Sequence, residues 1–124
     1  LLVEDNELNR EIAMELLREE GAQMEYAVNG ADGIKMFEQS QEYFYDLILM
    51  DVRMPVMDGY EATRRIRGME RGDAKSVPIL AMTADAFAED VARTKQCGMN
   101  GHLTKPLEVQ TLNQEIRRAL QSCL

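Results

Sequence analysis

Several residue types are scarce in this sequence of 124 residues, which has no tryptophan, one histidine, two cysteines and three prolines. Cys97 and Cys123 are too few and too unpatterned for a disulfide framework or a metal site, so we expect thiols in a reducing compartment. No apolar stretch is long enough to cross a bilayer, and no secretory signal pattern is present. The sequence therefore predicts a cytoplasmic domain that makes no membrane contact of its own.

Positive charge is also in short supply. The sequence has 14 Lys and Arg residues against 22 Asp and Glu residues, which gives a formal net charge of −8. A protein that binds the phosphate backbone of nucleic acid needs a basic face, so we expect no nucleic-acid partner. The local exception is the run Arg64, Arg65, Arg67 and Arg71, which we interpret as the solvated face of a helix.

The length and composition fit a single domain spanning residues 1–124. A chain of this size can bury one hydrophobic core, and 45% hydrophobic with 29% charged residues is ordinary for a globular protein. No linker, repeat or low-complexity tract divides it. Because the chain starts at Leu1, within an apolar segment typical of a strand, we expect it to be part of a longer polypeptide.

The most informative stretch is LILMDVRMPVMDGYEATRRIR, which contains Asp51. Four apolar residues run without alternation from Leu47 to Met50, as expected for a strand buried on both faces in a parallel sheet. A turn containing Pro55 and Gly59 follows, and then an amphipathic helix. Asp51 thus lies at the carboxyl end of a buried strand, where ligand sites form in open α/β sheets. The alternative interpretation is that Asp51 only ends the strand or caps the following helix.

Strand-like and helix-like segments alternate along the whole chain. Strands are predicted at 1–3, 24–28, 47–51, 77–83 and 102–104, and helices at 8–20, 31–40, 60–69, around 87–92, and around 112–120. Ala62, Ile66, Phe87, Val91 and Ala92 are expected to face the core. Short connections and right-handed crossovers predict an α/β fold, a five-stranded parallel sheet with five helices on two faces. Periodicity does not reveal the strand order, and for five units of this size we expect the flavodoxin-like, doubly wound order 2-1-3-4-5.

Five residues follow the carboxyl ends of four predicted strands, and a parallel sheet brings those ends to one edge. They are Glu4 and Asp5 after the first strand, Asp51 after the third, Thr83 after the fourth and Lys105 after the fifth. Carboxylates at close range repel each other unless a cation lies between them, and Mg²⁺ prefers such oxygen ligands. A cation, a nucleophilic carboxylate, a lysine and a hydroxyl are together the parts needed for phosphoryl transfer.

The segments LLVEDN, LILMDVRMPVMDGYEATRRIR, ILAMTADAF and GHLTKP resemble, in order and spacing, the receiver domains of two-component response regulators. The resemblance covers essentially the whole chain. It implies that Asp51 is the phosphoacceptor and takes a phosphoryl group from a phosphohistidine of a partner protein. It also implies self-catalysed phosphorylation and dephosphorylation, so that the domain itself is not clearly an enzyme.

The same resemblance implies roles for the neighbouring residues. Asp5 and Asp51 would ligate Mg²⁺ directly, Glu4 would act nearby through water, and the backbone carbonyl of Arg53 would be a further ligand. Thr83 would contact the phosphoryl group and Lys105 would pair with its oxygens. The Lys105–Pro106 peptide bond would be cis, a form that proline makes accessible.

The resemblance further implies a switch, in which Thr83 moves toward the phosphorylated Asp51 and frees space behind the fourth strand. Receivers usually place a Tyr or Phe three residues before the lysine to fill that space, whereas this sequence has His102. His102 is therefore the switch position and the main departure from the family pattern. The face made by the fourth helix, fifth strand and fifth helix is the expected switch surface.

The segment AMTADAFAEDVARTKQCGMNGHLTKPL is most similar to receiver domains fused to hybrid sensor histidine kinases. The implied partners are a histidine kinase, a histidine phosphotransfer domain, or both, with the domain a monomer or weak dimer in the cytoplasmic part of a membrane-bound sensor kinase. A stand-alone response regulator without an output domain is an alternative.

Two other protein classes remain as alternatives. A Mg²⁺-dependent phosphohydrolase with an aspartyl nucleophile usually has a second acid two residues after the nucleophile, where this chain has Arg53. A flavodoxin-like cofactor module needs a phosphate-binding loop after its first strand, where the acids around Asp5 would repel phosphate.

Overall fold

The computed structural model of the chain describes residues 1–54, 57–83, 88–105 and 107–121. The expectations for Phe87, the Val91 side chain, the Lys105–Pro106 bond and Cys123 lie outside the described residues. Within the described ranges, no helix is both long and apolar enough to span a membrane.

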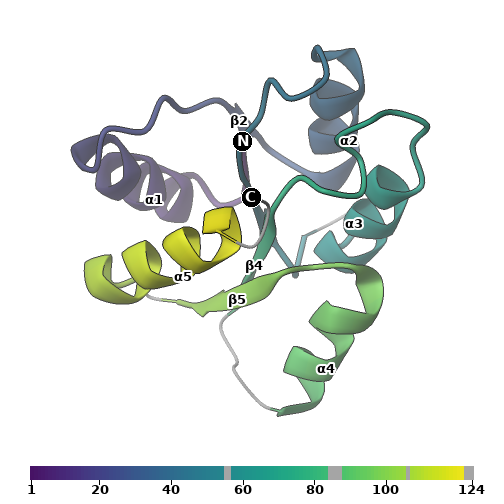
Figure 1. Cartoon of the computed structure of the whole chain (residues 1–124). Coiled ribbons are helices and arrows are strands. Elements are labelled where there is room, and N and C mark those ends of the chain that lie inside the picture. The colour runs from purple at the N-terminus through teal and green to yellow at the C-terminus, as the bar shows by residue number, and fades with distance from the viewer. Residues whose placement is uncertain (55–56, 84–87, 106, 122–124) are drawn as a thin grey trace.

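Five strands and five helices alternate along the described part of the chain, as the apolar periodicity predicts. They are β1 (Leu2–Val3), α1 (Glu7–Glu19), β2 (Tyr26–Ala27), α2 (Gly30–Gln39), β3 (Ile48–Asp51), α3 (Gly59–Arg67), β4 (Ile79–Thr83), α4 (Ala88–Cys97), β5 (Gly101–Thr104) and α5 (Val109–Gln121). All pairings are parallel, and the sheet order is β2-β1-β3-β4-β5 (Figure 1). The predicted fold class and strand order are confirmed.

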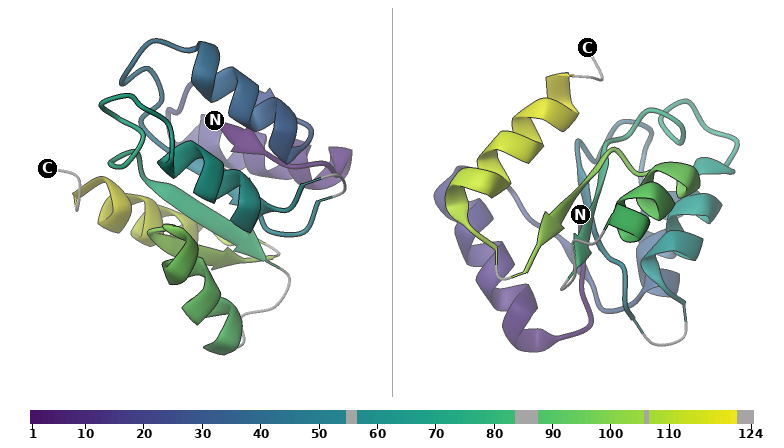
Figure 2. Two further views of the ribbon diagram at one scale, coloured as in Figure 1. Left: turned by 90° about the vertical axis from the view of Figure 1, so that its right-hand side faces the viewer. Right: turned by 90° about the horizontal axis from the view of Figure 1, so that it is seen from below.

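The helices cover the sheet in two layers, with α1 and α5 on one face and α2, α3 and α4 on the other (Figures 1 and 2). The strand β3 shows why the layers form, because Ile48 and Met50 belong to the core under α2 and α3 while Leu49 belongs to the core under α1 and α5. Alternate side chains of a strand point to opposite faces, so a strand that is covered on both faces must be apolar throughout.

Side chains before three helices fix where those helices begin. The side chains of Asn6, Asn29 and Asp58 each accept a hydrogen bond from the backbone N–H three residues later, at 2.8–2.9 Å. Such caps satisfy amide groups that the first turn leaves without partners. As a result α1, α2 and α3 each begin one residue before the start predicted from apolar spacing.

Some expectations about which residues are buried are wrong. Ala92 was expected to face the core and is exposed, whereas Ala62 and Ile66 are fully buried as expected. In α1 the apolar residues Leu8 and Ile12 are four positions apart, the spacing of one helix face, yet they are 65% and 45% exposed. The core contacts of α1 come instead from neighbouring turns of the helix, through Ala13, Met14 and Leu17.

The arginine run is only partly the solvated helix face that we predicted. Arg64 and Arg65 are exposed on α3 and pair with Glu61. Arg67 instead donates to the backbone carbonyls of Ala74, Val77 and Gly98, and Arg71 lies beyond α3 in an ion pair with the buried Asp73. A guanidinium with several donors can satisfy buried carbonyl groups that a loop leaves without partners, which is why these two arginines turn inward.

Candidate functional site

The pairing of β1 with β3 brings Glu4 and Asp5 close to the end of β3. Val3 lies beside Met50 across the β1–β3 pairing, so Glu4 and Asp5 follow β1 at the same edge at which Asp51 ends β3. Glu4 is 1% exposed and Asp51 is 4% exposed, while Asp5 is exposed. The predicted convergence of these acids at the carboxyl edge of the sheet is confirmed.

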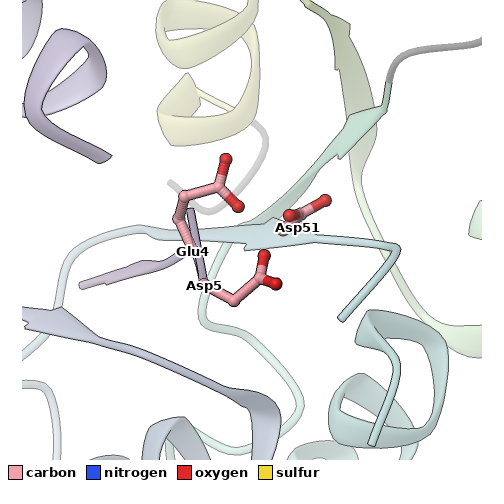
Figure 3. A group of neighbouring side chains, drawn as sticks. All are labelled: Glu4, Asp5 and Asp51. Carbon is pink, nitrogen blue, oxygen red and sulfur yellow. The ribbon is translucent and has the colours of Figure 1, made fainter. Parts of the chain in front are cut away.

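The three carboxylates form a compact cluster. One oxygen from each of Glu4, Asp5 and Asp51 lies within 4.8 Å of the others, close enough to hold one metal ion. Figure 3 shows the three side chains gathered at the end of β3. This spacing matches what a divalent cation with oxygen ligands requires.

Lys105 reaches the cluster from the segment directly after β5. Its Nζ lies 2.7 Å from Oε1 of Glu4 and 3.2 Å from Oδ2 of Asp51. The loop after β5 is positioned by β4, because the backbone N–H of Lys105 donates to the carbonyl oxygen of Thr83 at 2.8 Å. Burial alone would lower the pKa of Lys105, but the two carboxylates outweigh this and raise the pKa, so the side chain is cationic at neutral pH.

One lysine does not neutralise three carboxylates. Burial and the adjacent Glu4 carboxylate raise the pKa of Asp51 to about 7, against the opposing effects of Lys105 and of the Arg53 backbone N–H. That N–H donates to Oδ1 of Asp51 at 3.3 Å. In addition, Oε2 of Glu4 is buried and has no hydrogen-bond partner among the described residues. A buried carboxylate oxygen without a partner, beside an acid of raised pKa, fits a site built to hold a cation.

Close packing of backbone fixes the direction of Asp51. The first residue of α3 is Gly59, and a Cβ atom added there would collide with the carbonyl oxygen of Asp51. The turn between β3 and α3 therefore requires a glycine for close approach, whereas the sequence suggested only a sharp bend. This contact packs the start of α3 directly against the end of β3.

Thr83 and His102 occupy the positions that the sequence predicted. Thr83 ends β4, is 4% exposed, and lines a cleft together with Arg53. His102 is half-buried in β5 and lies beside Ala81 of β4. Since its neighbour Leu103 packs under α1 and α5, strand alternation places His102 on the face that α4 covers.

Sequence reasoning missed two residues at the same edge. Arg93 of α4 and Tyr60 of α3 also line the cleft beside Thr83, and the guanidinium carbon of Arg93 lies 4.2 Å from the centre of the Tyr60 ring. No local signal marks this pair, because the contact depends on how α4 packs against α3. A stacked arginine beside Thr83 is a feature that only the assembled fold reveals.

Comparison with known proteins places this site in a family. The family model for the response regulator receiver domain matches residues 1–117. The chain is 36% identical over 142 residues to "Probable histidine kinase 4" of Oryza sativa subsp. japonica, covering 100% of this chain and 14% of that protein. It is 41% identical over 120 residues to "Hybrid signal transduction histidine kinase G" of Dictyostelium discoideum, covering 95% of this chain and 3% of that protein.

Solved structures agree with these relatives. The receiver domain of a sensor histidine kinase from Pseudomonas aeruginosa, which has a magnesium ion coordinated in its active-site cleft, is 38% identical. It superposes with a TM-score of 0.85, covering 97% of this chain and 94% of the other. A chemotaxis protein from Vibrio cholerae is 29% identical with a TM-score of 0.86, covering 96% and 95%. This chain belongs to the response regulator receiver domain family.

Proposed function

We propose that Asp51 is the phosphoacceptor of a two-component phosphorelay. The observation that carries the proposal is the contact of Lys105 with two acids. Its Nζ lies 3.2 Å from Asp51 and 2.7 Å from the buried Glu4, and the exposed Asp5 lies beside them. A carboxylate at the open end of a strand, flanked by a fixed cation and further acids, is suited to attack on phosphorus.

The atoms and charges of the phosphoryl transfer are accounted for by the two proteins and one proton. An Oδ atom of Asp51 forms a bond to phosphorus, and the bond between phosphorus and the histidine nitrogen of the donor breaks. The imidazole that leaves takes up a proton. In the proposed transfer Lys105, 3.2 Å from Asp51, pairs with the phosphoryl oxygens, and the hydroxyl of Thr83, at the end of β4, donates a hydrogen bond to one of them.

We infer that the acidic cluster holds Mg²⁺. The residues fit the ion, since Glu4, Asp5 and Asp51 offer oxygens within 4.8 Å of one another, and the buried Oε2 of Glu4 has no hydrogen-bond partner in the described part of the chain. The backbone carbonyl of Arg53 is the proposed further ligand. When bound, Mg²⁺ supplies positive charge that offsets the repulsion between Asp51 and an incoming phosphoryl dianion.

The proposed partner is a histidine kinase or a histidine phosphotransfer domain, and the proposed parent is a hybrid sensor histidine kinase. The relatives support this origin, because the chain corresponds to only 14% and 3% of the two histidine kinases described above. The proposed output is a shift of the face formed by α4, β5 and α5, with His102 at the switch position.

The first test is the intact mass of the chain after incubation with Mg²⁺ and acetyl phosphate, beside the variant Asp51→Asn. We expect one acid-stable, base-labile phosphoryl adduct on the wild-type chain, and none without Mg²⁺ or in the variant. A folded, Mg²⁺-binding chain that gains no adduct would contradict the proposal and indicate a binding module. Turnover of many unrelated phosphate esters would indicate a phosphohydrolase instead.

A further inference from the structure

A cleft of about 500 Å³ lies beside the proposed phosphoacceptor site and contains two arginines. Arg53 reaches it from the segment after β3, and Arg93 reaches it from α4. Thr83, the proposed hydrogen-bond donor to the phosphoryl group, forms part of the same wall. The cleft therefore borders the place that the transferred group would occupy.

The guanidinium of Arg93 is held in place by an aromatic ring. Its central carbon lies 4.2 Å from the centre of the Tyr60 ring, and Tyr60 is only 5% exposed. Stacking uses the flat face of a guanidinium and leaves its N–H donors free in the plane of the group. Within the described parts of the chain, no hydrogen bond or ion pair takes up those donors.

Charge in the cleft is unusual for this acidic protein. Exposed arginines on α3 are paired with Glu61, whereas no carboxylate of the described residues lies within ion-pair distance of Arg53 or Arg93. Among the described residues that line the cleft, the one acid is Asp58, and it uses Oδ1 to cap α3. Two cations that have no carboxylate partner among the described residues thus face a cleft in a chain of net charge −8.

The proposed phosphoacceptor site next to the cleft needs positive charge. Among the described residues it holds three carboxylates against one cation, Lys105, so an incoming phosphoryl dianion is repelled. Cations at the rim of a cleft attract anions and raise the rate at which they enter.

We propose that Arg93 is an anion-binding residue of the phosphoacceptor cleft, held ready by Tyr60 and assisted by Arg53. The ligand is a phosphoryl dianion, from either the approaching donor or the aspartyl phosphate formed on Asp51. Arg93 makes and breaks no covalent bond; it donates hydrogen bonds to the anion and offsets its charge. This inference rests on the proposed function of Asp51 and adds a binding residue from α4.

The test measures how fast the phosphoryl adduct forms at increasing concentrations of acetyl phosphate, with Mg²⁺ present. For Arg93→Gln we expect the half-saturating donor concentration to rise about threefold, with a smaller change in the maximal rate. Arg93→Lys keeps the charge and should recover most of the loss. Arg64→Gln is the matched control, since Arg64 is exposed on α3 and lies outside the cleft.

Two further measurements separate a charge effect from a structural one and identify the anion. The difference between wild type and Arg93→Gln should shrink at high salt, because screening weakens exposed charges, and a packing defect would not respond in this way. Loss of the adduct after removal of the donor is then followed. A rate changed by about threefold in Arg93→Gln assigns the contact to aspartyl phosphate, and an unchanged rate assigns it to the donor.

Either of two results would overturn the inference. If Arg93→Gln and Arg64→Gln form adducts with the same half-saturation and lose them at the same rate at low salt, Arg93 binds no phosphoryl group and the proposed function stands. If wild type itself forms no adduct, the proposed function fails and this inference fails with it.

Discussion

Asp73 and Arg71 form an ion pair whose side chains are 2% and 10% exposed. With so little contact with solvent, each charge is stabilised almost wholly by the other and by nearby backbone groups. Nε of Arg71 lies 2.6 Å from Oδ1 of Asp73, and the backbone N–H of Tyr43 donates to Oδ2 at 2.8 Å. Nη1 of Arg71 donates to the carbonyl oxygens of Phe37 and Ser40, and Nη2 donates to Oδ2 of Asp73. At the scale of single residues, this network joins the end of α2 to the loop after α3.

We expect Asp73→Asn to lower the free energy of unfolding by about 2–4 kcal/mol at neutral pH, because it leaves the Arg71 guanidinium without its buried partner. Burial alone would raise the pKa of Asp73, but the Arg71 and Tyr43 donors outweigh it and lower the pKa below the ordinary 3.8. A lowered folded-state pKa contributes stability above about pH 4 that is lost as the pH falls further.

Urea unfolding between pH 3 and 7 checks this prediction. The gap between wild type and Asp73→Asn should narrow below about pH 4. The control is Glu61→Gln, which disturbs only exposed pairs and should change the free energy of unfolding by about 0.5 kcal/mol or less. A gap that is constant over the whole pH range would show that the Asp73 charge is not the source of the stability.

At the scale of elements, the junction between β3 and α3 sets the position of the site. The end of β3 carries Asp51, and α3 begins at Gly59 in direct contact with the Asp51 carbonyl oxygen. At the other end of the same helix, Gly68 follows α3 with φ −84°, and a Cβ there would meet only carbonyl oxygens at 3.5 Å or more. Gly59, the first residue of α3, and Gly68, just after its end, therefore differ in whether a larger residue can replace them.

Gly59→Ala is expected to lower the free energy of unfolding by about 1–3 kcal/mol, since the added methyl group must displace backbone at the end of β3. It should also slow formation of the Asp51 adduct, because the carboxylate moves with that backbone. Gly68→Ala should be neutral or stabilising by up to about 1 kcal/mol, because alanine fits the backbone there and restricts the unfolded chain. Thermal unfolding of both variants measures the contrast, and equal effects would contradict the close packing at Gly59.

For the molecule as a whole, the parallel sheet concentrates negative charge at one edge. The strands β1 and β3 end there with three acids, and Lys105 supplies one cation in return. Burial, together with the adjacent Glu4 carboxylate, raises the pKa of Asp51 to about 7. The folded chain therefore carries an electrostatic cost that a bound divalent cation would relieve.

We expect Mg²⁺ to stabilise the folded chain through the acidic cluster. At a free concentration ten times the dissociation constant, the free energy of unfolding should rise by about 1.4 kcal/mol. In the variant Asp5→Asn the gain at the same Mg²⁺ concentration should be smaller, because one exposed ligand is lost. Urea unfolding with and without Mg²⁺ provides the measurement, with K⁺ at equal ionic strength as the control for general screening. Equal stabilisation by both ions would argue against a specific site.

The sequence alone determined the alternation of strands and helices, the family and the residues that meet at the edge of the sheet. These depend on local signals: uninterrupted apolar runs such as 47–50 predict buried parallel strands, and the acids after such runs must share an edge once the sheet is parallel. The motif spacing then predicted Glu4, Asp5, Asp51, Thr83 and Lys105 in their observed places.

Only the tertiary structure decided which residues are covered and what they touch. Leu8, Ile12 and Ala92 have the spacing or the chemistry of core residues and are exposed, whereas Asp73 sits in a polar loop and is buried. Likewise, no pattern marks the stacking of Arg93 on Tyr60. Periodicity reports which residues share a face of one helix, but burial and contact depend on a second element from elsewhere in the chain.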